Sequence, residues 1–209
     1  MDYWRVKYLI PAINSRENIA LIGIGDASKY LQYSPEQMMK MWDPYIISRK
    51  CSDYCIYDID EKVIKLANQH GINAAYCDIT KSTLGRQFKY IFASDVIEHV
   101  HNPVAFLSNI TQSLEPQGLL VITTPNSVYW RNCIIDSYQE FPEHLFCFNQ
   151  KHLKNLASTI GLEVVELTSF QTTEGLDTWR KKIIQPFHKL MVKLGRGNSL
   201  VMAARKNQI

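Results

Sequence analysis

The sequence lacks the cysteine pairs that a disulfide scaffold or a zinc site requires. Its five cysteines contain no C-x-x-C pair, and an odd number in a chain of 209 residues is typical of reduced thiols in a cytosol. We therefore expect a cytoplasmic protein whose cysteines are small buried hydrophobic residues. They are Cys51, Cys55, Cys77, Cys133 and Cys147.

Long apolar runs and a strong charge of either sign are also missing. No apolar run approaches the ~18 residues of a membrane-spanning helix, and charges interrupt the apolar residues at the N-terminus. We expect neither a transmembrane segment nor a signal peptide. The net charge of +3 is too small to indicate a nucleic-acid partner. With 46% hydrophobic and 21% charged residues the chain is typical of a globular protein, and its length favours one domain.

Glycine is scarce, but two of the nine glycines stand close together. The apolar run 19–22 leads into Gly23-Ile24-Gly25, and a helical pattern follows. Strand, glycine turn and helix commonly mark a nucleotide site, because glycine accepts positive φ and lets a ligand approach the backbone. Ser28 stands where the dinucleotide fingerprint G-x-G-x-x-G has its last glycine. This disfavours a dinucleotide-dependent dehydrogenase, and a glycine turn without any ligand remains an alternative.

Strand and helix patterns alternate along the rest of the chain. Strand-like segments 54–59, 72–76, 90–94, 118–123, 162–168 and 199–204 alternate with helix-like segments that include 61–70, 104–114 and 150–160. This pattern predicts an α/β fold with a doubly wound, mostly parallel sheet. Ligands of such sheets bind outside the carboxyl ends of the strands. Gly25, Asp58, Asp78, Asp95 and Asn126 all follow predicted strands at that edge.

Asp58 is the candidate for a ribose contact. A carboxylate can accept two hydrogen bonds from a vicinal diol, and an acid after the second strand has this role in nucleotide-binding α/β folds. Asp58 lies beyond the ~20 residues expected after the glycines, so segment 29–50 must contain an insertion. As an alternative, Asp58 and Asp60 cap the following helix, a role that suits Asp60 well.

Several segments match one family. They are IALIGIGDA (19–27), YDIDEKVIKLANQHG, AAYCDIT, EHLFCFNQKHLKNLASTIGLEVVE and, most specifically, DVIEHVHNPVAFLSNI followed by SLEPQGLLVITTPN. From residue 19 to about 166, and less specifically to 204, the chain resembles the class I S-adenosylmethionine-dependent methyltransferases. The closest branch is that of small-molecule O-methyltransferases, which includes the ubiquinone-biosynthesis type.

The resemblance implies one Rossmann-like methyltransferase domain over residues 1–209. Its sheet has seven strands, mostly parallel, with helices on both faces and a last antiparallel strand. Cap insertions are expected near 29–50, 126–148 and 172–197. S-adenosyl-L-methionine is the implied cofactor and a small molecule, through a hydroxyl group, the implied methyl acceptor. The implied cofactor-binding residues are Gly23, Gly25, Asp26, Asp58, Ile59, Asp78, Ile79, Asp95 and Glu98.

Two residues depart from the glycine motif of that family. Leu21 replaces the acidic residue near the methionine ammonium group, and Ala27 replaces the last glycine. Asp26 is a candidate to take over the ammonium contact, unless it is an exposed loop carboxylate. The alternative function is therefore a degenerate member that binds cofactor weakly or not at all and acts as a partner subunit.

Methylation of a hydroxyl needs an aligned acceptor and a base, and histidine suits the base because its pKa lies near neutrality. His99 and His144 are the candidates at the expected edge, although a structural role is an alternative for each. We assign the acceptor contact to the loop residue His144 and a supporting role to His99. No metal ligand set is expected. The TTPN segment does not match the Asn/Asp-Pro-Pro-aromatic signature of nitrogen methylation, which disfavours RNA or protein substrates.

Segment 179–194 is predicted to cap the acceptor side. Its apolar and basic residues alternate as in a pair of amphipathic helices broken at Pro186. A basic face of this kind can also rest on an anionic membrane surface, or form the contact of a homodimer.

Overall fold

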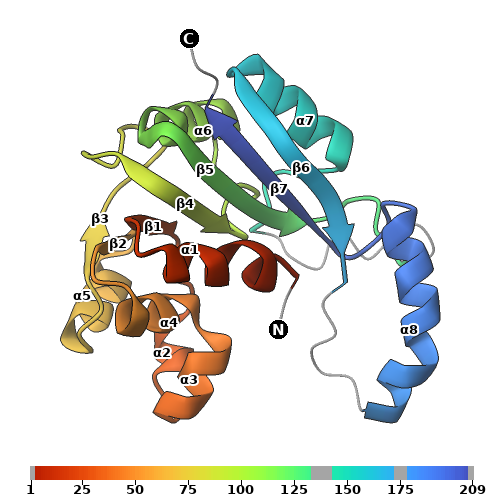
Figure 1. The fold of residues 1–209 in the computed structure, drawn as a ribbon, viewed down its shortest axis with the longest axis horizontal. Helices are drawn as coiled ribbons and strands as arrows, with labels where there is room; N and C mark the ends of the chain where they lie inside the picture. The colour runs from red at the N-terminus through yellow and green to blue at the C-terminus, as the bar shows by residue number, and fades with distance from the viewer. Residues whose placement is uncertain (1–2, 133–142, 172–177, 207–209) are drawn as a thin grey trace.

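The computed structural model describes residues 3–132, 143–171 and 178–206, which form one seven-stranded sheet with helices around it (Figure 1). The strand order is β3-β2-β1-β4-β5-β7-β6. The last strand, β7, pairs antiparallel with β5 and β6, and all other neighbouring strands are parallel. The predicted fold class is therefore confirmed.

The elements in chain order are η1 (Arg5–Leu9), α1 (Ile10–Ser15), β1 (Ile19–Ile22), α2 (Ala27–Tyr30), α3 (Pro35–Met41), α4 (Asp43–Lys50), β2 (Tyr54–Asp58), α5 (Glu61–Gln69), β3 (Ala74–Tyr76), β4 (Phe88–Ser94), α6 (Pro103–Gln112), β5 (Leu114–Pro125), α7 (Gln150–Thr159), β6 (Leu162–Phe170), α8 (Thr178–Lys193) and β7 (Ser199–Lys206). Most agree with the predicted segments within a few residues. The strand before the glycines, the proline-initiated helices and the helix ends at Gly71 and Gly161 all lie where the sequence indicated.

The central strands are buried on both faces, which explains why they are apolar throughout rather than alternating. All four residues of β1 are buried. Ala20 and Ile22 pack in the cluster that includes α6 and α7, whereas Ile19 and Leu21 pack on the opposite face with α1, α4 and α5. The carboxyl end of β1 is therefore held in place by core packing on both faces of the sheet.

The predicted insertion at 29–50 forms the short helices α2, α3 and α4, and a proline lies in the first turn of both α3 and α4. Pro35 begins α3 behind the Ser34 cap, and Pro44 is the second residue of α4. Trp42 is buried, stacks on Tyr30 and donates its indole N–H to the Ile24 carbonyl at 3.0 Å. The insertion therefore supports the glycine turn from one side.

Two predicted boundaries are wrong. Pro186 lies inside α8, so this segment is one helix rather than a broken pair. A proline removes one backbone hydrogen bond, which bends a helix without having to end it. β5 begins at Leu114 instead of 118, because a register shift between Phe88 and Tyr90 accommodates the extra residues.

Several other expectations concern exposure. The thiols of Cys51, Cys55, Cys77 and Cys147 are free. Cys55 and Cys77 are buried as predicted, whereas the prediction is wrong for Cys51, which is half-buried, and for Cys147, which is exposed. Cys133 lies outside the described residues, as do parts of the two later cap segments. None of the helices within the described ranges is long and apolar enough to cross a membrane.

Replacing Trp42 by Phe should lower the free energy of unfolding by about 1–3 kcal/mol, because the buried Ile24 carbonyl loses its donor. Urea titration measures the change. Trp130→Phe is the matched control, since within the described chain the indole N–H of Trp130 is buried without a partner. A Trp42 variant as stable as the Trp130 variant would show that the bond to Ile24 contributes nothing.

Candidate functional site

The glycine turn has the geometry of a ligand cradle. Gly23 and Gly25 have φ of 90° and 70°, which side chains rarely adopt. A Cβ on Gly23 would lie 2.8 Å from the Val96 side chain, whereas a Cβ on Gly25 would meet no atom within 4 Å. Gly23 thus permits close packing against Val96, and Gly25 presents its backbone to open space.

Asp58 lies beside this turn, as the sequence predicted. Its Oδ2 accepts a hydrogen bond from the Ile24 N–H at 2.7 Å, and its Oδ1 accepts from the Asp60 N–H at 2.9 Å. Each carboxylate oxygen retains a lone pair for a further donor. The next residue, Ile59, is 65% exposed and offers an apolar surface at the same edge. Asp60 caps α5 through the N–H groups of Lys62 and Val63, which confirms that role.

Asp78 follows β3, and its carboxylate interacts with the side chains of two nearby residues, Thr80 and Lys81. Its Oδ1 accepts from the Thr80 hydroxyl at 2.6 Å, and its Oδ2 lies 2.8 Å from the Lys81 ammonium. Lys81 and then Thr80 hold the pKa of Asp78 below its usual range. The side chain of Ile79 is buried in the core beneath. Asp78 is therefore a carboxylate in a fixed position.

Asp26 caps α2, since its carboxylate accepts from the Ser28 hydroxyl at 2.6 Å and from the Lys29 N–H at 3.1 Å. These bonds lower its pKa. The side chain is exposed, in accord with the simpler interpretation of this residue. Contact with a methionine ammonium group stays a prediction.

The two departures from the glycine motif are core positions. Leu21 is 2% exposed, lies between Ile56 and Phe92 in the sheet, and packs under α1 and α4. Ala27 is fully buried at the start of α2. Both methyl-bearing side chains fill the hydrophobic cluster on that face, so they leave the open side of the turn unobstructed.

A second group of polar residues follows β4. Asp95 has a φ of 52°, and its N–H donates to the Thr123 carbonyl at 3.0 Å, which turns the chain sharply at the strand end. The Thr123 hydroxyl lies 3.3 Å from Asp95 Oδ1. The turn carries Val96 against Gly23 and brings Glu98 inward.

Glu98 is a buried carboxyl group, only 1% exposed. Its Oε2 accepts from the Thr124 hydroxyl at 3.0 Å, but Oε1 has no hydrogen-bond partner among the described residues. Burial, and secondarily the charge of Asp95, raises the pKa of Glu98 to about 8. The sequence pattern did not predict this burial, nor a carboxyl oxygen without a hydrogen-bond partner in the described chain.

The structure brings the two predicted histidines together. The rings of His99 and His144 have centroids 4.8 Å apart. The loop of His144 is fixed by the N–H groups of Leu145 and Phe146, which donate to the Glu98 carbonyl at 2.8 and 3.2 Å. His99 Nδ1 lies 3.1 Å from the Glu143 carbonyl. Burial, and secondarily His99, lowers the pKa of His144, so its imidazole is neutral at pH 7.

One donor atom each from Glu98, His99 and His144 lies within 4.8 Å of the other two. A carboxylate and two imidazoles at this spacing can exchange protons, or can together hold a divalent cation. No metal ligand set was predicted from the sequence, in which the two histidines are 45 residues apart. Only the fold brings them together.

Comparisons with known proteins agree with this geometry. Residues 28–167 match the family described as "Methyltransferase domain", a range that includes Asp58, Asp78, Glu98 and both histidines. Two curated ubiquinone biosynthesis O-methyltransferases are similar. That of Parvibaculum lavamentivorans is 38% identical over 76 residues, 33% of this chain and 30% of that protein. That of Bartonella bacilliformis is 27% identical over 140 residues, 61% of this chain and 56% of that protein.

Solved structures extend the likeness to nearly the whole chain. A methyltransferase from Archaeoglobus fulgidus has a TM-score of 0.65 and 19% identity, with 97% of this chain and 91% of that one covered. A methyltransferase from Bacillus halodurans has a TM-score of 0.64 and 16% identity, with 97% and 100% covered. These are likenesses of fold.

A doubly wound sheet with a glycine turn, an acid after β2 and a polar group after β4 defines a Rossmann-like methyltransferase. The chain belongs to the methyltransferase domain family, since the family match covers well over half of it. The resemblance to class I S-adenosylmethionine-dependent methyltransferases is confirmed. The chain spans from under a third to about half of the length of the curated relatives.

Glu98 predicts a distinctive pH dependence of stability. Between ~4.3, the pKa of an unfolded glutamate, and about 8, the folded protein keeps a proton that the unfolded chain has lost. The free energy of unfolding should therefore fall by about 2–5 kcal/mol relative to Glu98→Gln as pH rises from 5 to 9.

Urea unfolding in buffer with EDTA at pH 5, 7 and 9 measures this difference. Glu163→Gln, which changes an exposed glutamate on β6, serves as the control and should follow the wild type. Parallel curves for the wild type and Glu98→Gln would contradict the raised pKa.

Proposed function

We propose that this protein transfers the methyl group of S-adenosyl-L-methionine to a hydroxyl of a small molecule. The observation that carries the proposal is the packing of Val96 against Gly23. It sets the turn that bears Glu98 and His99 against the glycine cradle, so the cofactor end and the histidine end of the edge form one site. The names of the curated relatives support oxygen as the acceptor atom.

The glycine cradle fits the cofactor. The open space at Gly25, the remaining lone pairs of Asp58 and the exposed face of Ile59 suit a backbone contact, a ribose diol and an adenine ring. Asp78 is the proposed partner of the adenine amine, and the backbone from Asp95 to Glu98 closes the methionine end. When bound, the cofactor supplies an electrophilic methyl group.

His144 is the proposed base. Its imidazole would accept the proton of the acceptor hydroxyl while the acceptor oxygen takes the methyl group that the bound cofactor supplies. His99 orients the ring of His144, with the two ring centroids 4.8 Å apart, and Glu98, which keeps its proton below about pH 8, can donate a hydrogen bond to a neighbouring imidazole.

Asp58→Ala should weaken binding of S-adenosyl-L-homocysteine by roughly 1.5–3 kcal/mol, the range for hydrogen bonds to a charged group. Isothermal calorimetry measures the affinity. Asp60→Ala is the control, because Asp60 caps α5 without contacting the glycine turn, and should lose stability but not affinity.

An unchanged affinity in Asp58→Ala would refute the ribose contact. A wild-type protein that fails to bind at all would favour the alternative function, a degenerate partner subunit.

His144→Ala should lower turnover by ~10²-fold or more and leave the affinity for S-adenosyl-L-homocysteine intact, because general-base catalysis contributes ~10²–10⁴-fold. Methyl transfer from labelled cofactor to a panel of phenols and sugars identifies an acceptor for the assay. The control is His101→Ala, which removes an exposed histidine of the same segment. Retained turnover, or a loss of cofactor binding instead, would refute the assignment.

A second candidate uses the same three side chains as a divalent-cation site that lowers the pKa of the acceptor hydroxyl. The buried Glu98 Oε1 without a partner in the described chain favours it. Dialysis against EDTA should then abolish turnover, Mg²⁺, Mn²⁺ or Zn²⁺ should restore it, and Glu98→Gln should prevent the restoration. Full activity after EDTA would eliminate the cation.

The exposed face of α8 retains two proposed uses. Phe187, Leu190 and Leu194 are 43%, 51% and 59% exposed, with Lys189 and Lys193 between them. Co-sedimentation with anionic liposomes tests a peripheral membrane contact, and sedimentation equilibrium tests a homodimer. A monomeric protein that does not bind anionic liposomes would exclude both uses and leave only the proposed role of α8 as a cap.

A further inference from the structure

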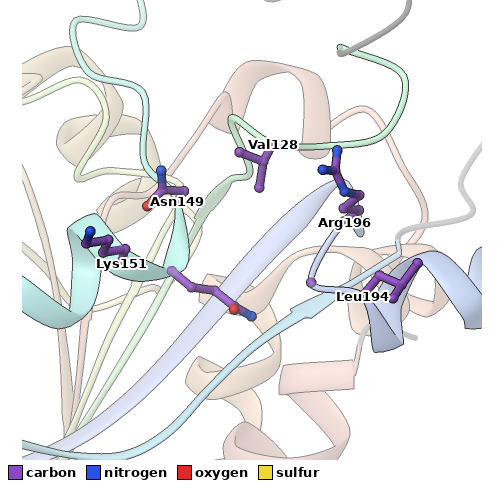
Figure 2. Close-up of a pocket in the computed structure, with 7 residues that line it drawn as sticks. Val128, Asn149, Lys151, Leu194 and Arg196 are labelled. Carbon is purple, nitrogen blue, oxygen red and sulfur yellow. The ribbon is translucent and has the colours of Figure 1, made fainter.

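A cavity of about 260 Å³ lies beyond the carboxyl end of β5, and Figure 2 shows the residues that line it. The loop after β5, the start of α7 and the turn between α8 and β7 surround it. Its walls are formed by Val128, Asn149, Gln150, Lys151, Leu194, Gly195 and Arg196.

The walls carry positive charge and no acidic residue. Arg196 and Leu194 lie on one side, Asn149 and Lys151 on the other, and Val128 at the top between them (Figure 2). The side-chain oxygen Oδ1 of Asn149 accepts a hydrogen bond from the His152 N–H at 2.9 Å. The side-chain nitrogen Nδ2 of Asn149 is therefore left as a donor. Two cations and an amide donor suit a carboxylate or phosphate, and the apolar Val128 and Leu194 suit a hydrocarbon group next to it.

The cationic turn is held in place by the backbone. The Gly195 carbonyl accepts a hydrogen bond from the side-chain amide of Asn126 at 3.0 Å. The backbone N–H of Arg196 donates to the Met191 carbonyl at 2.8 Å, and the Arg196 carbonyl accepts from the backbone N–H of Trp130 at 3.3 Å. A cavity whose walls are fixed in this way loses little freedom when a ligand binds.

The cavity is connected to the histidine site by short segments. Phe148 is bridged to Asn126, and its carbonyl accepts from the Ser127 N–H at 2.8 Å. Asn149 follows His144 by five positions in the chain, so their Cα atoms are at most about 18 Å apart. A cavity of this size is below the ~300–1,000 Å³ of whole-ligand pockets, so it accommodates one end of a molecule.

We propose that this cavity binds the anionic group of the methyl acceptor, which is therefore an organic carboxylate or phosphate with its hydroxyl at His144. This inference rests on the proposed methyl transfer for its link to the acceptor. The cavity discriminates charge, and the histidine site performs the chemistry at the other end of the same molecule.

Binding of small probes tests the cavity without turnover. Benzoate, its neutral isostere benzamide and inorganic phosphate are titrated into the full ¹⁵N-labelled chain with S-adenosyl-L-homocysteine present, and amide signals are followed by NMR. Benzoate should shift the signals of Val128, Asn149 and Arg196, and should bind at least ~5-fold more tightly than benzamide, because two charge-assisted contacts are lost with the charge. Phosphate should bind more weakly than benzoate, since it leaves the apolar walls uncovered.

The variant with both Lys151→Gln and Arg196→Gln should bind benzoate at least ~10-fold more weakly, while its cofactor affinity stays unchanged. Lys154→Gln removes an exposed lysine one turn further along α7 and should bind benzoate like the wild type. Thermal unfolding of each variant verifies its fold.

Equal binding of benzoate and benzamide, or full benzoate affinity in the double variant, would overturn the anion site. Phosphate that binds as tightly as benzoate would overturn its assignment to an acceptor, because the cavity would then hold a free inorganic ion. Failure of the wild type to bind S-adenosyl-L-homocysteine would instead sink the proposed function, and the benzoate comparison would still decide the cavity.

Discussion

The hydrogen bond from the Ile24 amide to the Asp58 carboxylate fixes the functional edge of this protein. β1 and β2 end side by side, and the Gly23 N–H still donates to the Tyr57 carbonyl at 2.8 Å, so the next peptide group is tied to a side chain of the same strand. Two consecutive bonds to β2 force the chain away from the sheet, and positive φ at Gly23 and Gly25 makes this turn possible. The cradle and the acid beside it are thus a single unit.

Two neighbours hold that unit from other directions. The Trp42 indole binds the Ile24 carbonyl, so the insertion between α2 and α4 stabilises the residue whose N–H binds Asp58. On the other side Val96 occupies the space that a side chain at position 23 would fill. Because Val96 belongs to the turn after β4, the positions of Glu98 and His99 are set relative to the cradle by core packing rather than by a mobile loop.

The sequence predicted those parts of the site that depend on local pattern. Apolar runs that end in Gly23, Asp58 and Asp95 identify strands and place these residues at one edge, because parallel strands share that edge. The sequence could not predict the burial of Glu98, since one turn residue points inward only when Thr124 of a separate strand offers a hydroxyl there. The sequence could not predict the approach of His99 and His144 either, because it depends on hydrogen bonds from Leu145 and Phe146 to the Glu98 carbonyl, 47 and 48 residues earlier in the chain. The predicted break at Pro186 is wrong for a related reason. The low helix propensity of proline indicates a break, but the helix continues on both sides of Pro186 in α8.

The fold leaves the acceptor atom open, so the side chains beyond the strand ends must determine it. NodS of Bradyrhizobium japonicum, with a TM-score of 0.59, is named an N-methyltransferase, and CurJ, with a TM-score of 0.55, a carbon methyltransferase. A hydroxyl oxygen is weakly nucleophilic, so methylation at oxygen gains from a base that accepts the hydroxyl proton during the attack. Burial lowers the pKa of His144 and raises that of Glu98 to about 8, so near pH 7 the imidazole is the proton acceptor of the pair and the carboxyl group keeps its proton. The burial of Glu98 and His144 thus places a protonated carboxyl group beside an unprotonated imidazole, and these are the two kinds of group that a proton-transfer step uses.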